Sequence, residues 1–318
     1  MDIALNNLLS PAVLFFTLGL FAAIVRSDLD LPAPIPKLLS LLLLMAIGFK
    51  GGVGLASSPF SSDVVTVLGL AMLLATVVPV VAFFILRLNV AVPDAAAIAA
   101  TYGSVSAVTF VTAIDFLERQ AVPFGGHMVA AMSLMESPAI VVGILLARVF
   151  GANSAERPPW GKVLHESLLN GPVLLLVGSL LIGTVATLWR GVPVVYKPIN
   201  EIIFPVVLMF FLLDLGILAG RRLKDLRRLG GFLGVFAFAM PLAAGGVGFA
   251  LSELASLPPG DALLLTILAA SASYIAVPAA MRIALPSAEP GVYVTMALTL
   301  TFPFNIVAGI PLWWTLIA

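Results

Sequence analysis

Two segments of the sequence place hydroxyl and small side chains inside otherwise apolar stretches. They are TYGSVSAVT at 101–109 and AASASYIAVPA at 269–279, and the second contains Pro278. Such segments can lose helical hydrogen bonds and interrupt a helix. An interrupted helix leaves free carbonyl groups at the end of its first half and free N–H groups at the start of its second half. The pattern therefore predicts two broken helices whose breaks carry backbone N–H and carbonyl groups without helical partners.

The free N–H groups suit a small anion, because a helix N-terminus carries partial positive charge. We expect the second halves of the two broken helices to begin around 105–109 and 272–276, and to bind such an anion. The predicted substrate-binding residues are Val105, Ser106, Ala107, Thr109, Ala272, Ser273, Tyr274 and Ile275.

The free carbonyl groups suit a hard cation such as Na⁺, with hydroxyl, amide and carboxylate oxygens as further ligands. The predicted sodium-binding residues are Thr101, Gly103, Ser104, Glu136, Ala270, Ser271 and Asn305. A different interpretation of the same pattern is that serine and alanine only allow the helices to pack closely.

Glu136 lies near the centre of an apolar stretch at 124–148. An unpaired carboxylate is costly there, so we expect it to face a polar cavity, a cation or a proton. A protonated carboxyl group that is hydrogen-bonded to a neighbour is the structural alternative.

The composition indicates that these segments lie in a membrane. Hydrophobic residues make up 61% of the 318 residues and charged residues 10%, whereas soluble domains average roughly 45–50% and 25%. The sequence has no cysteine, and its two histidines do not form an HExxH motif. We therefore expect an integral membrane protein with no organic cofactor and no bound nucleic acid, and not an enzyme.

Proline, glycine and charged residues divide the chain into ten apolar stretches. Each is long enough for a helix that crosses a membrane, which needs about 20 residues. We predict an all-α protein in which the fourth and ninth helices are broken. The expected spans are 8–25, 35–57, 63–86, 92–118, 124–148, 166–189, 198–219, 231–252, 261–285 and 290–316.

The two halves of the sequence resemble each other. Shifting 94–123 by 167 positions superposes it on 261–290 without a gap, so that Asp94 matches Asp261 and Asp115 coincides with Arg282. Five helices per half is an odd number, so the second half enters from the opposite side. This predicts an inverted-topology repeat, an architecture of secondary transporters. The predicted units are 1–150, a cytoplasmic connector at 151–165, and 166–318.

Basic residues favour the cytoplasmic side of a membrane. With ten spans, one side holds 12 lysines and arginines and the other 4. This asymmetry predicts that both termini lie in the periplasm. The basic segment Arg221–Arg228 is then cytoplasmic, where it can bind anionic lipid.

Several motifs resemble the sodium-dependent bicarbonate transporter (SbtA-type) permeases, and the similarity covers nearly the whole chain. The motifs are GSVSAVTFVTAIDFLE, ESPAIV, SASYIAVPAAMRIALPSAEPGVYV and TFPFNIVAGIPL. The resemblance implies Na⁺-coupled uptake of bicarbonate across a bacterial inner membrane by a homotrimer of ten-helix protomers. It also implies a PII-like protein as a cytoplasmic regulator.

From the residues and the resemblance together, we expect a secondary active transporter. The alternatives are a proton- or sodium-coupled carrier or exchanger of another small anion, and a channel or membrane sensor.

Overall fold

A computed structural model describes residues 7–32, 34–57, 62–151, 169 and 171–318. The regular structure of these residues is entirely helical. Apart from Gly151, the predicted connector at 151–165 lies outside the described residues, as do residues 166–168 and 170 of the expected sixth span.

The first half contains six described helices. They are α2 (Pro11–Ile24), α3 (Pro34–Ser57), α4 (Ser62–Leu86), α5 (Val92–Gly103), α6 (Ala107–Arg119) and α7 (His127–Phe150).

The second half contains helices that are interrupted by π-helical and 3₁₀ turns. They are α9 (Gly171–Arg190), η1 (Pro198–Ile203), α10 (Phe204–Arg222), η2 (Leu223–Arg228), α11 (Gly230–Leu254), α12 (Pro259–Ala270), α13 (Ala276–Ala284), α14 (Pro290–Thr295), η3 (Met296–Thr301), α15 (Phe302–Phe304), η4 (Asn305–Gly309) and α16 (Ile310–Ile317).

Both predicted breaks are present. The first lies between α5 and α6, where residues 104–106 are not helical. The second lies between α12 and α13, at residues 271–275. Ser104 and Ser271 occupy the position after the first half-helix in extended conformations, with ψ of −177° and 172°. An extended residue cannot continue a helix, so each helix stops there.

The lengths of the described helices support eight membrane crossings, whereas the sequence predicts ten. Within the described residues, eight helices are long and apolar enough to cross a membrane. The two other apolar helices are shorter: α2 has 14 residues and α12 has 12. At 1.5 Å per residue, neither spans a hydrocarbon core of about 30 Å alone. The ten-span count therefore stays a prediction.

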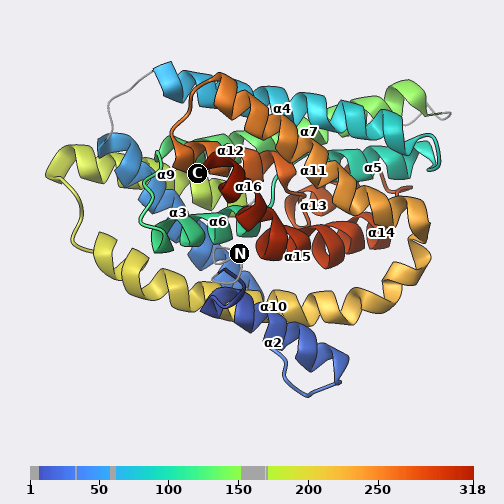
Figure 1. Cartoon of the computed structure of the whole chain (residues 1–318), viewed down its shortest axis with the longest axis horizontal. Coiled ribbons are helices and arrows are strands. Elements are labelled where there is room, and N and C mark those ends of the chain that lie inside the picture. Colours follow the sequence, from blue (N-terminus) through green and yellow to red (C-terminus); the bar gives the residue numbers. More distant parts are fainter. Residues whose placement is uncertain (1–6, 33, 58–61, 152–168, 170) are drawn as a thin grey trace.

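The helices pack as two groups (Figure 1). Helices α2, α3, α9 and α10 form what we call the four-helix group, in which α2 packs on α10 and α3 packs on α9. The remaining helices form what we call the crossing group, because it contains both breaks. In it, α5 packs on α4 and α7, and α12 packs on α11 and α16.

Glycines bring the four helices into close backbone contact. A Cβ atom on Gly52 of α3 or on Gly216 of α10 would collide with the facing helix. The two contacts are counterparts, because each residue of one lies 164 positions from its equivalent in the other. The facing backbone belongs to Leu180 and Thr184 for Gly52, and to Phe16 and Leu20 for Gly216.

Two equivalent aspartates tie the crossing group together at its opposite ends. Asp261, which begins α12, accepts a hydrogen bond from the N–H of Gly125 at 2.6 Å. Asp94, which begins α5, accepts one from the N–H of Glu289 at 2.7 Å. Each aspartate thus holds the loop that follows the other broken helix, and this fixes the two breaks relative to each other.

Candidate functional site

The two breaks cross and hydrogen-bond to each other. The N–H of Ser106 donates to Oγ of Ser271 at 3.0 Å, and the N–H of Ser273 donates to the carbonyl of Thr101 at 2.9 Å. Oγ of Ser271 also donates to the carbonyl of Leu268 at 2.9 Å. All of these serine and threonine residues are buried. The crossing is therefore a fixed unit whose remaining unpaired groups define what it can bind.

The start of α6 leaves two backbone N–H groups without a helical acceptor. Of its first four N–H groups, that of Thr109 donates to Oγ of Ser106 at 3.1 Å, and that of Phe110 donates to the carbonyl of Ser106 at 3.1 Å. The N–H groups of Ala107 and Val108 have no earlier turn to accept them. Ser106 therefore caps α6 and leaves two donors for a ligand.

The start of α13 repeats this arrangement. The N–H of Val277 lies 3.3 Å from Oγ of Ser273, Pro278 has no N–H, and that of Ala279 points to the carbonyl of Ile275. The N–H of Ala276 is left without a helical acceptor. The two second halves thus present three donors and two helix N-termini to the space between them.

That space is a cavity of about 150 Å³. Since a water molecule needs about 10–15 Å³ by this measure, the cavity has room for a small polyatomic anion together with water. The crossing group contributes both breaks to its wall, and the four-helix group contributes the opposite side. The lining residues are Ser40, Leu43, Leu44, Val105, Ser106, Ala107, Val108, Val111, Glu136, Pro172, Val173, Leu176, Phe211, Ser273, Tyr274, Ile275, Ala276 and Ala279.

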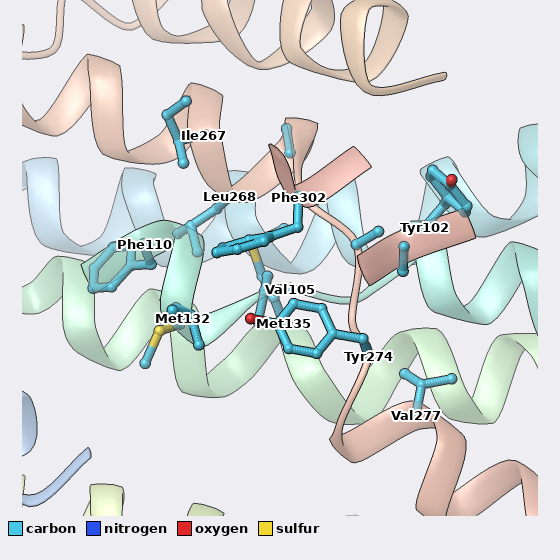
Figure 2. Close-up of a cluster of buried hydrophobic side chains, with 14 of the residues drawn as sticks. Tyr102, Val105, Phe110, Met132, Met135, Ile267, Leu268, Tyr274, Val277 and Phe302 are labelled. Atoms are coloured by element: carbon cyan, nitrogen blue, oxygen red, sulfur yellow. The ribbon is translucent and has the colours of Figure 1, made fainter. Parts of the chain in front are cut away.

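Aromatic and apolar side chains fix the wall at the crossing (Figure 2). The ring of Tyr274 packs edge-on against that of Phe302, with centroids 5.6 Å apart. Val105 and Met135 lie beside Tyr274 in Figure 2, and both are about 98–99% buried. These contacts hold the two extended segments in place and keep the wall apolar around the donors.

Glu136 is the one acidic residue among the described residues that line this cavity, and no basic residue lines it. Glu136 is half-buried, and within the described chain it forms no ion pair or side-chain hydrogen bond. An anion that binds beside this carboxylate would be repelled unless a cation or a proton compensates the charge.

A second set of oxygen atoms lies at the carbonyl ends of the breaks. The side-chain oxygens of Thr101, Ser104 and Asn305 are buried and lack hydrogen-bond partners among the described residues. Nδ2 of Asn305 donates to the carbonyl of Ala270 at 2.8 Å, which leaves its Oδ1 free. Unpaired buried oxygens of this kind fit a hard cation, which prefers oxygen ligands.

The structure separates the predicted site residues into those that line the cavity and those that do not. Six of the eight predicted substrate residues line the cavity, whereas Thr109 and Ala272 do not. Glu136, predicted as a sodium ligand, lies in the cavity with the substrate residues. The other predicted sodium residues do not line it; they are Thr101, Gly103, Ser104, Ala270, Ser271 and Asn305.

The sequence did not predict the part of the wall that belongs to the four-helix group. Ser40 of α3, Val173 of α9 and Phe211 of α10 complete the cavity, although they lie far from both breaks in the sequence. Local composition carries no signal for these contacts, because they arise from packing between the groups.

Comparison with known proteins gives one family. The family model described as "Na+-dependent bicarbonate transporter superfamily" matches residues 11–318, which includes both breaks and Glu136. A search of curated proteins gave no significant match.

Proposed function

The chain belongs to the Na⁺-dependent bicarbonate transporter superfamily, and from this premise we propose that it takes up bicarbonate together with Na⁺ as a secondary active transporter of a bacterial inner membrane. The observation that supports this best is the cavity, in which helix N–H donors and an unpaired carboxylate face each other without a basic side chain. An anion beside this carboxylate binds stably only when a cation compensates the negative charge. Transport of the anion and transport of the cation are therefore coupled.

In this proposal, bicarbonate binds the N–H groups of Ala107, Val108 and Ala276 between the two helix N-termini. Ser106 and Ser273 cap these helices and orient the donors. Na⁺ binds the unpaired side-chain oxygens at the carbonyl ends of the breaks. The negative charge of Glu136, which lines the cavity, stabilises the bound Na⁺ further. Coupling follows if only the filled and the empty carrier change sides.

The ten-span inverted repeat is part of the same proposal. The glycine contacts that repeat after 164 positions and the reciprocal aspartate bonds support it. Alternating access then consists of movement between the four-helix group and the crossing group around a shared site.

With both termini in the periplasm, a reporter enzyme fused after Ala318 should be active only if it folds in the periplasm. The expected result is an active fusion after Ala318 and an inactive one when the same reporter is inserted after Arg222, in the basic segment. An inactive fusion after Ala318, in protein that is expressed normally, would contradict the ten-span topology.

Glu136 also favours a second candidate function, proton-coupled transport of a small anion. A proton on this carboxyl group would remove the repulsion as a cation does. The anion specificity is part of this question, because three N–H donors suit any small oxyanion.

The experiment that separates these functions is uptake of labelled bicarbonate into proteoliposomes. An inward Na⁺ gradient should drive accumulation, and a proton gradient of equal size without Na⁺ should not. Competing formate, nitrate and acetate report the specificity. Accumulation driven by protons alone would reject sodium coupling and select the second candidate.

The proposal extends to the assembly. We propose a homotrimer, with a PII-like regulator and anionic lipid as partners of the cytoplasmic face. Arg221, Arg222 and Lys224 lie in the described part of the basic segment, and Arg221 forms an ion pair with Asp30 at 3.1 Å. The other basic side chains there leave charge for lipid headgroups.

A further inference from the structure

Four charged residues lie near the cavity but do not line it: Lys50, Asp115, Asp214 and Arg282. One of them, Lys50 of α3, forms an ion pair with Glu118 of α6. Asp115, on the same face of α6 one turn earlier, also interacts electrostatically with Lys50. The ion pair therefore connects the four-helix group to the crossing group.

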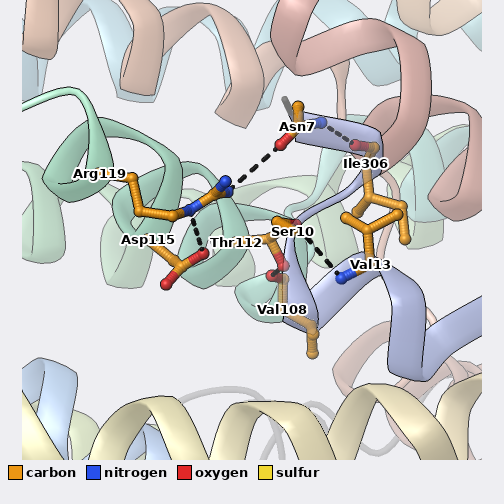
Figure 3. Close-up of polar contacts among 8 residues, drawn as sticks. All are labelled: Asn7, Ser10, Val13, Val108, Thr112, Asp115, Arg119 and Ile306. Carbon is orange, nitrogen blue, oxygen red and sulfur yellow. Dashed lines mark hydrogen bonds and ion pairs between the residues drawn. The ribbon is translucent and has the colours of Figure 1, made fainter. Parts of the chain in front are cut away.

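This connection lies beyond one end of the cavity, which we call the closed end. Asp115 lies one turn beyond Val111, which lines the cavity, and Lys50 lies further along α3 than the lining residues Leu43 and Leu44. Figure 3 shows the surroundings: Arg119 bonds Asp115 at 3.0 Å and contacts Asn7, whose side chain donates to the carbonyl of Ile306. Charged and polar contacts between segments far apart in the sequence therefore gather at this end.

The opposite end of the cavity lies toward the segment 221–228, and we call it the basic side. In Figure 1 it is at the right, where α10 ends. The lining residues Ser40 and Pro172 lie near the starts of α3 and α9, and both are partly exposed. Ile275 in the break is 44% exposed. The cavity therefore opens toward the basic side.

The repeat assigns Lys50 and Asp115 charged counterparts on the basic side, whereas Glu118 falls on Leu285. Lys50 precedes Gly52 by two residues, and Asp214 precedes the equivalent Gly216 by two. Asp115 corresponds to Arg282 in the gapless alignment of the broken helices. The signs are exchanged: the four-helix group contributes the base at the closed end and the acid at the open end.

Asp214 and Arg282 each lie one turn beyond a residue that lines the cavity, and they do not pair with each other in this structure. Asp214 lies one turn beyond Phe211, and Arg282 lies one turn beyond Ala279; both of these neighbours line the cavity. No ion pair within the described residues involves Asp214 or Arg282. Asp214 is half-buried and lies in a hollow that Asp30 and Arg221 also line, and Arg282 is exposed.

We propose that Asp214 and Arg282 form an ion pair when the carrier changes sides, and that this pair closes the cavity on the basic side. The cluster of Lys50, Asp115 and Glu118 is then the counterpart that closes the other side in the present structure. The inference rests on the proposed alternating-access function. It assigns Asp214 and Arg282 a role in stabilising the conformation that is closed on the basic side, without contact to the substrate.

Cross-linking tests the proposal directly, because the natural chain has no cysteine. The double variant Asp214→Cys, Arg282→Cys in membranes should react with a short bismaleimide to give an intramolecular cross-link. Adding Lys50→Ala should raise the cross-linked fraction at least twofold, since it releases the opposite end. The matched control is Val206→Cys with Arg282→Cys, because Val206 is an exposed residue two turns away on α10; it should not cross-link.

A charge exchange supplies a second, independent test by uptake. Asp214→Arg and Arg282→Asp alone should each reduce Na⁺-dependent uptake at least fivefold, and the double exchange should restore it to within twofold of the natural protein. No cross-link above the control, or a double exchange no better than the single ones, would overturn the proposed pair. Absence of Na⁺-dependent uptake by the natural protein would reject the proposed transport function. This result is distinguishable from rejection of the Asp214–Arg282 pair, which the cross-linking tests without transport.

Discussion

Replacing Ser106 or Ser273 by valine should abolish most bicarbonate uptake while the protein still assembles. Each serine caps the N-terminus of a second half-helix, and Ser106 accepts both the N–H and the hydroxyl of Thr109. Valine removes the acceptor, which costs about 0.5–2 kcal/mol for a helix cap, and places a branched side chain against the donors of Ala107 and Val108. Since about 1.4 kcal/mol is a factor of ten, only the upper part of this range gives tenfold by itself, and with the crowding of the donors added we expect at least a tenfold loss of uptake for each variant.

The matched control is Thr112→Val on the same helix. Thr112 is buried, but its hydroxyl donates to the carbonyl of Val108 within α6 and does not line the cavity. Its uptake should stay within twofold of the natural protein. Near-normal uptake by both Ser106→Val and Ser273→Val would move the site away from the breaks and leave these serines a packing role.

Glu136→Gln should weaken the apparent affinity for Na⁺ roughly tenfold to a hundredfold. The carboxylate faces the cavity without an ion pair, so its charge is available to a cation. Loss of one charged group that stabilises a bound cation costs about 1.5–3 kcal/mol. The apparent affinity for bicarbonate, measured at saturating Na⁺, should change less, because the N–H donors remain.

The control for Glu136 is Ser133→Ala, one turn earlier on α7. The hydroxyl of Ser133 bonds the carbonyl of Val129 in its own helix, and Ser133 does not line the cavity. Both variants should insert equally well. An unchanged dependence on Na⁺ in well-folded Glu136→Gln would assign this residue to structure, and a shifted pH profile without a change in Na⁺ affinity would favour proton coupling.

The positions of the breaks were predictable because their causes are local. Small and hydroxyl residues at 101–109 and 269–279 end the half-helices at Gly103 and Ala270. The same local signals identified Ser106 and Ser273 as residues of the cavity wall. The repeat strengthened both predictions, because it places the two segments in equivalent spans.

The other wall of the cavity was not predictable from composition. Phe211 and Val173 resemble any other residue of an apolar helix, and only the packing of the two groups brings them to the breaks. The sequence did hold one unused signal. Gly52 and Gly216 lie 164 positions apart, and this register would have located the contacts of α3 with α9 and of α10 with α2.

Interrupted hydrogen bonding in the last span was also missed. Helical π-turns at Met296–Thr301 and Asn305–Gly309 flank Phe302. Pro303 and Pro311 indicate that the helix is irregular here. Whether the irregularity takes the form of π-helical turns depends on the residues that pack against this segment. Asn7, for example, donates to the carbonyl of Ile306 at 2.7 Å, a contact across nearly the whole sequence.

The central claim is that the crossing binds Na⁺ and bicarbonate together, and equilibrium binding to the purified protein tests it most directly. The dissociation constant for labelled bicarbonate should fall at least tenfold when choline is replaced by Na⁺. By linkage, bicarbonate should tighten Na⁺ binding by the same factor, and Glu136→Gln should reduce this factor. Equal affinity for bicarbonate in choline and in Na⁺ would contradict the account.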